Sequence, residues 1–393
     1  MRLDGIRILD LTRLLPGPYA TQLLADSGAE VVKVEDTGAG DYARSMPPRS
    51  DRGVGAIFDA VNRGKRSVSI DLKSPDGREA FYRLVETADV VLEGFRPGVV
   101  ERLEVNYETL AERNEELIYC SLSGYGQDGP LSGRAGHDLN YVGLAGLLDM
   151  TRASPDAKPQ VPGYPLGDMA GGLFAAFAIV EALLARALGN SSGEYVDVAM
   201  TDVVASFSQV LAHDALDDEV PDPRPGETNL TGALPWYDCY ETSDGRWVTL
   251  AALEPKFWRA FCESVDREDL LEHHGSPDPD VREALRDELA SLFATRTRDE
   301  WDERFADVDA TVGGVYAPAE MATHPQIEAR GLVVDPDDAP ARIGFPARSS
   351  EPPERGPDAE AIPEQGEHTD AYLREVGYDD GEIEALRDRE IVR

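Results

Sequence analysis

Two short motifs place titratable side chains beside glycines. In "GHDLNY" (136–141), His137 stands between a glycine and an aspartate, ahead of an apolar run, and it is one of only six histidines in the chain. An imidazole titrates near neutral pH and can accept or donate a proton there. The same pattern also fits a plain structural histidine at the start of a helix, with Asp138 as the cap.

Two carboxylates could join this chemistry. Asp168 opens a long apolar helix in "PLGDMAGG", and the neighbouring glycines allow a ligand or a partner helix to approach closely. Glu254 ends an apolar strand in "LAALEPKFW". The alternative for both is a simple helix-start acid, stabilised by the helix dipole.

The elements that would position these groups alternate between strands and helices. Strand-like runs occupy 5–11, 30–35, 67–72, 89–95 and 117–126, with helical patterns between them. This alternation predicts an α/β fold with a parallel, doubly wound sheet. The loop after the first run, "RLLPGP", lacks G-x-G-x-x-G, so the fingerprint of a nicotinamide or flavin site is missing.

The rest of the chain predicts a second, smaller domain. The apolar helix over 168–188 is expected to be buried almost all round, as in a domain core or a subunit interface. A Pro-rich linker (217–229) precedes a hairpin at 236–253 around "TSDG", and helices fill roughly 255–306. After about 330 the chain reads as acidic loop until a short helix at 381–389. We therefore expect a large domain over 1–216, a small α+β domain over 230–329 and a C-terminal segment over 330–393.

Composition excludes several classes of function. The formal charge is −37, so a nucleic-acid duplex would be repelled. Only five of 38 basic residues are lysines, and this balance is typical of a protein adapted to concentrated salt, although a generally acidic protein is the alternative. No signal peptide or membrane-spanning stretch is expected. Three cysteines without metal or redox spacing favour a reduced cytoplasm and no metal site.

Taken in order, the motifs resemble a known family. "GHDLNY", "GDMAGG" and "WYDCYETSDGRWVTLAALEPKFW" are similar to the α-methylacyl-CoA racemases of the class III CoA-transferase (CaiB/BaiF) superfamily, and the likeness runs from about residue 3 to 330. It implies a Rossmann-like CoA-binding domain, a small domain and a C-terminal segment that returns to the large domain. It also implies an interlocked homodimer, with each active site between one chain's large domain and the other's small domain.

The resemblance assigns roles to the three titratable residues. His137 and Asp168 would exchange the α-proton of an acyl-CoA thioester on opposite faces, and Glu254 would share a proton with Asp168. The amides at the start of the Asp168 helix would stabilise the enolate oxygen. No cofactor is expected to stay bound, because coenzyme A arrives as part of the substrate.

The resemblance also implies contacts to coenzyme A. Lys73, Arg96 and Arg102 match the family's basic positions, and Asp138 and Tyr141 are placed with them. Some relatives carry an arginine where this chain has Asp36, so one phosphate contact would be missing here or supplied by Arg44 or Arg63.

Two alternatives remain open. A CoA-transferase of the same fold would use Asp168 as a nucleophile to form an anhydride, for example between succinyl-CoA and mesaconate, and would not need His137. A non-catalytic acyl-CoA binder would need neither His137, Asp168 nor Glu254.

Overall fold

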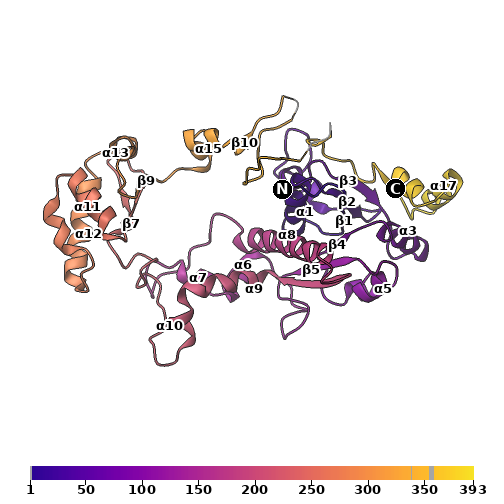
Figure 1. Cartoon of the computed structure of the whole chain (residues 1–393), viewed down its shortest axis with the longest axis horizontal. Helices are drawn as coiled ribbons and strands as arrows, with labels where there is room; N and C mark the ends of the chain where they lie inside the picture. The colour runs from indigo at the N-terminus through magenta and orange to yellow at the C-terminus, as the bar shows by residue number, and fades with distance from the viewer. Residues whose placement is uncertain (1, 338, 354–357) are drawn as a thin grey trace. The chain divides into compact units, whose positions relative to one another are not determined.

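The computed structural model describes residues 2–337, 339–353 and 358–393 (Figure 1). It contains two compact units. Unit 1 comprises Met1–Gly146, Pro162–Ser208 and Gly331–Arg393, and unit 2 comprises Leu147–Val161 and Gln209–Arg330. Residues 147–161 and 209–216, which the sequence boundaries place in the large domain, therefore group with the smaller unit.

A six-stranded parallel sheet forms the centre of unit 1, as the strand pattern predicts. Its order is β3-β2-β1-β4-β5-β6. The strands are β1 (Arg7–Asp10), β2 (Glu30–Glu35), β3 (Arg66–Ser69), β4 (Val90–Glu93), β5 (Ile118–Ser123) and β6 (Glu194–Ala199). All but β6 lie inside, or within one residue of, the five strand-like runs of the sequence.

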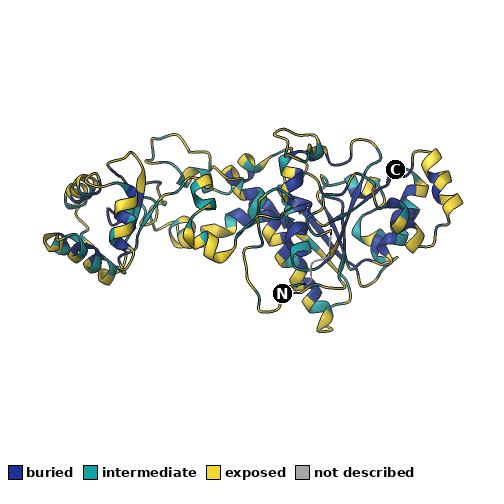
Figure 2. Cartoon of the chain, turned by 90° about the horizontal axis from the view of Figure 1, so that it is seen from above, coloured by how far each residue is buried: buried dark blue, intermediate teal, exposed yellow. Residues whose placement is uncertain are grey.

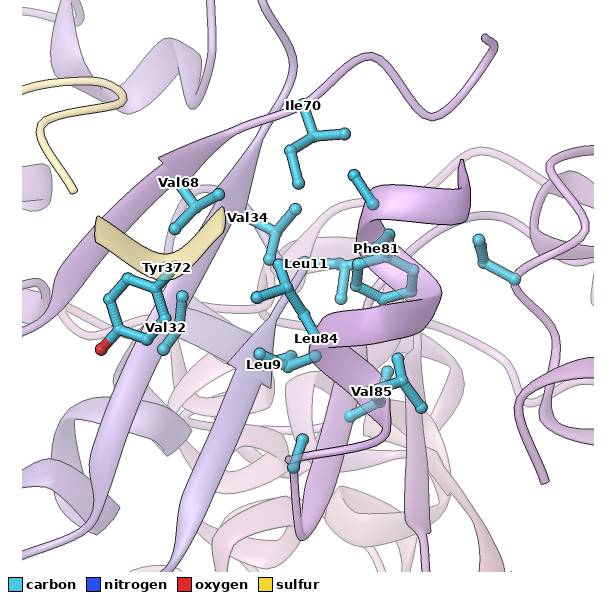
Figure 3. Packing of buried hydrophobic residues seen from close by; sticks show 14 of the residues in the cluster. Leu9, Leu11, Val32, Val34, Val68, Ile70, Phe81, Leu84, Val85 and Tyr372 are labelled. Carbon is cyan, nitrogen blue, oxygen red and sulfur yellow. The ribbon is translucent and has the colours of Figure 1, made fainter. Parts of the chain in front are cut away.

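Helices cover both faces of this sheet. On one face, α3 (Pro75–Val85) packs Phe81 and Leu84 against β1 and β2, and Tyr372 of α16 (Thr369–Glu375) joins the same cluster (Figure 3). On the other face, α1 (Pro16–Asp26) and α8 (Leu166–Ala187) form the second cluster. Strands β1 to β5 are accordingly mostly buried, the edge strand β6 is partly exposed, and the helices keep exposed outer faces (Figure 2).

Glycines let α8 sit close to its neighbours. A Cβ added at Gly172 would lie 2.4 Å from the carbonyl oxygen of Pro16, and one at Gly171 would lie 2.4 Å from Cγ of Met200. Within the single chain only 39% of an apolar 18-residue window of α8 is buried, so burial almost all round stays a prediction that depends on a partner subunit. By length and composition alone α8 could cross a membrane, a test that core helices also pass. The sequence of α8 does not show which of its apolar sides packs on the sheet and which is exposed.

Unit 2 is a small α+β unit. The antiparallel strands β7 (Tyr237–Glu241), β8 (Trp247–Ala251) and β9 (Val312–Gly314) confirm the hairpin around "TSDG". Three helices, α11 (Pro255–Ser264), α12 (Pro279–Phe293) and α13 (Arg298–Phe305), pack aromatic side chains such as Trp258 and Phe293 into its core.

The C-terminal segment is more ordered than the sequence indicates. Besides α17 (Asp380–Asp388), it contains α16 and the short pair β10 (Val333–Val334) and β11 (Arg342–Ile343). A seven-residue helix such as α16 is too short to be stable alone. It is stabilised by burial of Tyr372 and Leu373 against the sheet, a tertiary contact that the local sequence pattern does not show.

The remaining helices are short. They are η1 (Tyr42–Arg44), α2 (Ala56–Val61), α4 (Val99–Arg102), α5 (Tyr107–Ala111), α6 (Asp138–Leu144), α7 (Leu147–Met150), α9 (Met200–Ser206), η2 (Phe207–Leu211), α10 (Ala212–Leu216), η3 (Glu268–His273), α14 (Pro318–Ala322) and α15 (Pro325–Arg330).

Candidate active site

A hollow of about 450 Å³ lies in unit 1 where the carboxyl ends of β1, β4 and β5 meet. Its walls are the loops that follow these strands, together with residues 132–137, Asp168 and Met200. Ligands of open parallel sheets bind at this edge, where loops diverge from neighbouring strands. Of the residues predicted from the sequence, the hollow brings together His137, Asp168, Arg96 and Tyr141.

His137 is the residue before α6 and has an extended backbone (φ −131°, ψ 173°). Its N–H donates to Oδ1 of Asn140 at 3.1 Å, and its side chain is exposed at the wall of the hollow. The Tyr141 hydroxyl donates to the carbonyl of Gly136 at 2.7 Å, with the ring so close that a Cβ at Gly136 would lie 2.7 Å from it. The glycine of "GHD" thus allows the loop to fold over Tyr141.

Asp168 is the third residue of α8 and is half-buried. Burial, followed by the nearby negative charge of Asp138, raises the pKa of Asp168 to about 6, against the opposing effect of His137. Its carboxylate makes no hydrogen bond to any residue within the described ranges. A carboxyl group in this state can both give and take a proton near neutral pH.

Asp138 does not cap its own helix. Its Oδ1 accepts hydrogen bonds from the backbone amides of Gly167 at 2.6 Å and Asp168 at 3.1 Å, so it caps α8 instead. Two of the first amides of α8 are therefore already bonded, and donation from this helix start to an enolate oxygen stays a prediction. Whether Asp138 also touches coenzyme A stays a prediction.

Glu254 lies in unit 2 as the N-cap residue of α11, and its side chain is exposed. Within unit 1, the carboxylate that raises the pKa of Asp168 is Asp138. The proton shared between Asp168 and Glu254 therefore stays a prediction.

The hollow gathers positive charge in an acidic chain. Arg13, Arg96 and Arg134 line it, whereas Lys73 and Arg102 are exposed and do not. Arg96 and Arg134 form no ion pair with any described acid. The sequence analysis missed Arg13 and Arg134. The one local sign of Arg134 was its position three residues before His137.

Asp36 is used internally. It pairs with Arg13 at 2.8 Å. Arg44, which could have supplied the missing phosphate contact, is held by Glu35 at 2.7 Å, and Arg63 is buried beside Asp26 at 3.1 Å. Both guanidinium groups are thus paired with acids of unit 1, and whether the phosphate contact is missing or supplied by one of them stays a prediction. In the described part of the chain, no group of three or more His, Cys, Asp or Glu side chains could hold a metal ion.

Comparison with known proteins identifies the family of the chain. The family profile described as "CoA-transferase family III" matches residues 3–369. The chain belongs to this family. Mouse α-methylacyl-CoA racemase is 35% identical over 397 residues, covering 100% of this chain and 98% of the relative.

Other members of CoA-transferase family III are equally similar. The succinyl-CoA:mesaconate CoA-transferase of Haloarcula marismortui is 36% identical, covering 96% of this chain and 97% of the relative. The crystal structure of a CAIB/BAIF family protein from Brucella suis superposes with a TM-score of 0.81 at 31% identity, covering 95% of this chain and 99% of that one. The chain is therefore an enzyme of this family, with racemases and transferases at comparable distance.

Proposed function

We propose that the protein is a 2-methylacyl-CoA racemase. The observation that carries this proposal is that His137 and Asp168 line the same hollow, one from the start of α6 and the other from the first turn of α8. A transferase would need only the aspartate, whereas proton transfer at a stereocentre needs two groups on opposite faces.

In the proposed reaction, one group removes the proton bound to the α-carbon. The electron pair of that C–H bond forms the C=C bond of an enolate while the π pair of the C=O bond moves to the thioester oxygen, and the other group then donates a proton to the opposite face of the α-carbon. The pKa of about 6 suits Asp168 to both directions of this exchange. The amides of Gly167 and Asp168 are already bonded to Asp138, so donation from this helix start to the enolate oxygen stays a prediction.

The arginines of the hollow support an anionic thioester as the ligand. Coenzyme A carries phosphates that the acidic surface would repel. Arg96 and Arg134, without acidic partners among the described residues, offer the local positive charge that offsets this repulsion.

CoA transfer is the second candidate, favoured by the Asp168 carboxylate, to which none of the described residues donates a hydrogen bond. That carboxylate would attack the thioester carbon and expel the CoA thiolate, forming a mixed anhydride. The Haloarcula relative has this class of activity by name, with succinyl-CoA and mesaconate.

We also propose a homodimer. The open face of α8 exposes a row of large apolar side chains: Leu173, Phe174, Phe177, Val180 and Leu184. An apolar strip of this kind is typical of a protein interface. A second copy of the chain is the occupant that the family resemblance implies.

One experiment separates the two reactions. The protein is incubated with a 2-methylacyl-CoA in deuterated water without an acceptor acid, and α-deuterium is measured by mass spectrometry. Exchange supports the racemase. Acyl transfer to an added carboxylate without exchange supports the transferase, and the absence of both refutes the proposed function.

A further inference from the structure

Two of the five lysines are completely buried beneath the candidate site. Lys33 lies on β2 and Lys65 directly before β3, and their side chains, like those of Asp10 and Asp41, are 0% exposed. Burying a charge is costly unless it is paired and hydrogen-bonded. These buried lysines and aspartates therefore need a structural explanation, because they contribute nothing to solubility at the surface.

Lys65 holds the first turns of α1, which directly follow the β1–α1 loop. Its Nζ donates to the Pro18 carbonyl at 3.0 Å, to Thr21 Oγ1 at 2.7 Å and to Asn62 Oδ1 at 3.0 Å, and it lies 3.3 Å from Oδ2 of Asp10.

Lys33 holds the beginning of the same loop. Its Nζ donates to the Thr12 carbonyl at 2.8 Å and lies 2.9 Å from Oδ2 of Asp41. Oδ1 of Asp41 accepts the N–H of Leu14 at 3.2 Å and of Ala43 at 3.0 Å. One ion pair thus fixes both the carbonyl of Thr12 and the amide of Leu14.

Leu14 is strained. Its φ of +66° lies in the left-handed region, which residues other than glycine seldom adopt. Such a conformation persists only where the surroundings determine it, and it concentrates at functional sites. Leu14 lines the hollow, and Pro16 of the same loop contacts Gly172 of α8 closely.

We propose that the buried Lys33–Asp41 pair positions the reaction site, by holding Leu14 in its strained conformation and so fixing the loop wall of the hollow that adjoins the first turns of α8. Lys33 and Asp41 are then positioning residues that act through residues 12–16 on the place of the substrate relative to Asp168. This inference rests on the proposed function, because it takes the hollow as the acyl-CoA site.

The ionised state of Lys33 and Asp10 fits this role, whereas burial lowers the pKa of Lys65 to about 7. Burial alone would lower the pKa of Lys33, but Asp10 and Asp41 raise it above its usual value. Burial alone would likewise raise the pKa of Asp10, yet Lys65 and Lys33 bring it to about 2. Lys33 and Asp10 are therefore charged at neutral pH.

Asp41→Asn tests the pair, because asparagine keeps an acceptor oxygen and removes the charge. At a temperature where circular dichroism shows a folded protein, we expect kcat for α-deuterium exchange to fall on the order of 10- to 100-fold, as for a substrate misplaced by a small distance. Hydrogen–deuterium exchange of the 11–19 peptide should accelerate. Asp26→Asn, which alters another buried pair of unit 1, should lower the melting temperature and leave both readouts unchanged.

Leu14→Gly and Leu14→Ala test the strain. Both remove the side chain, but only glycine relieves the left-handed backbone. We expect Leu14→Gly to melt at or above the temperature of Leu14→Ala and to exchange the α-proton about tenfold more slowly. In the Leu14→Gly background, Asp41→Asn should add little further loss.

Equal kcat in the glycine and alanine variants, or a full additional loss from Asp41→Asn in the glycine background, would overturn the proposal. If Asp41→Asn does not fold, the comparison of Leu14→Gly with Leu14→Ala tests the proposal by itself. If the wild-type protein catalyses neither exchange nor transfer, the proposed function fails. The positioning role can then still be tested without activity, by measuring the protection of the 11–19 peptide and, by calorimetry, the dissociation constant for coenzyme A.

Discussion

The Asp138 carboxylate accepts a hydrogen bond from the backbone N–H of Asp168 at 3.1 Å. It thereby ties the first residue of α6 to the first turn of α8, and the residue next to it in the chain is His137. One side chain thus sets the spacing of the two proposed proton-transfer groups and adds a negative charge beside one of them.

Asp138→Asn should shift the pH profile of exchange. The amide keeps an acceptor for α8 but removes the charge that, together with burial, raises the pKa of Asp168 to about 6. The pKa of Asp168 should fall, so the limb of kcat/KM that reports it should move to lower pH. Glu254→Gln is the matched comparison. A shift with Glu254→Gln and none with Asp138→Asn would assign the raised pKa to the predicted partner instead.

Asp138→Ala should cost stability as well. It removes the acceptor for the amides of Gly167 and Asp168, and loss of a helix cap costs about 1 kcal/mol. Urea unfolding monitored by circular dichroism measures this change in the free energy of unfolding. An unchanged midpoint would show that the cap contributes nothing.

His137→Ala and Asp168→Ala should impair opposite stereoisomers. General acid–base groups contribute about 10²- to 10⁴-fold, and each variant should lose exchange mainly from the isomer whose proton it removes. Chiral separation of deuterated products from each pure isomer measures this. If Asp168→Ala abolishes CoA transfer while His137→Ala retains it, the transferase assignment replaces the racemase.

Arg134→Ala should weaken binding more than chemistry. A hydrogen bond to a charged group contributes about 1.5–3 kcal/mol, so KM for the acyl-CoA should rise roughly 10- to 100-fold with kcat little changed. Arg83→Ala removes a cation from α3, away from the hollow, and should leave KM as it is. A KM unaffected by Arg134→Ala would remove this residue from the site.

Phe177→Asp should disrupt the proposed dimer. The side chain is 58% exposed on the open face of α8, and a carboxylate there would be buried unpaired in an apolar interface. Light scattering should give half the wild-type mass, whereas Phe177→Leu should keep the dimer. A wild-type monomer at working salt concentration would refute the dimer itself.

Thermal stability should rise with salt. Screening weakens the mutual repulsion of an excess of 37 negative charges, and the Debye length falls from about 10 Å at 0.1 M to about 3 Å at 1 M. Calorimetry in dilute and molar potassium chloride measures the difference in Tm, with sucrose as an uncharged control. Equal Tm in both salt concentrations would contradict the proposed salt adaptation.

The sequence by itself determined where the strands follow one another along the chain and which residues make up the motifs. Apolar runs bounded by glycine and proline are local patterns, so β2 could be located to the residue, and "GHD" and "GDMAGG" marked two walls of the hollow. The alternation of strands with helices was enough to predict a parallel sheet, since that connectivity permits few other folds.

Tertiary structure alone decided which groups meet. No local pattern shows that Asp138 caps a helix 29 residues away from it, that Arg134 joins Arg96 in the hollow, or that Lys33 is buried against Asp41. Hydrogen bonds and ion pairs depend on distances of a few ångströms between segments that are remote in sequence. Those distances are set by how α8 and the β1–α1 loop pack together.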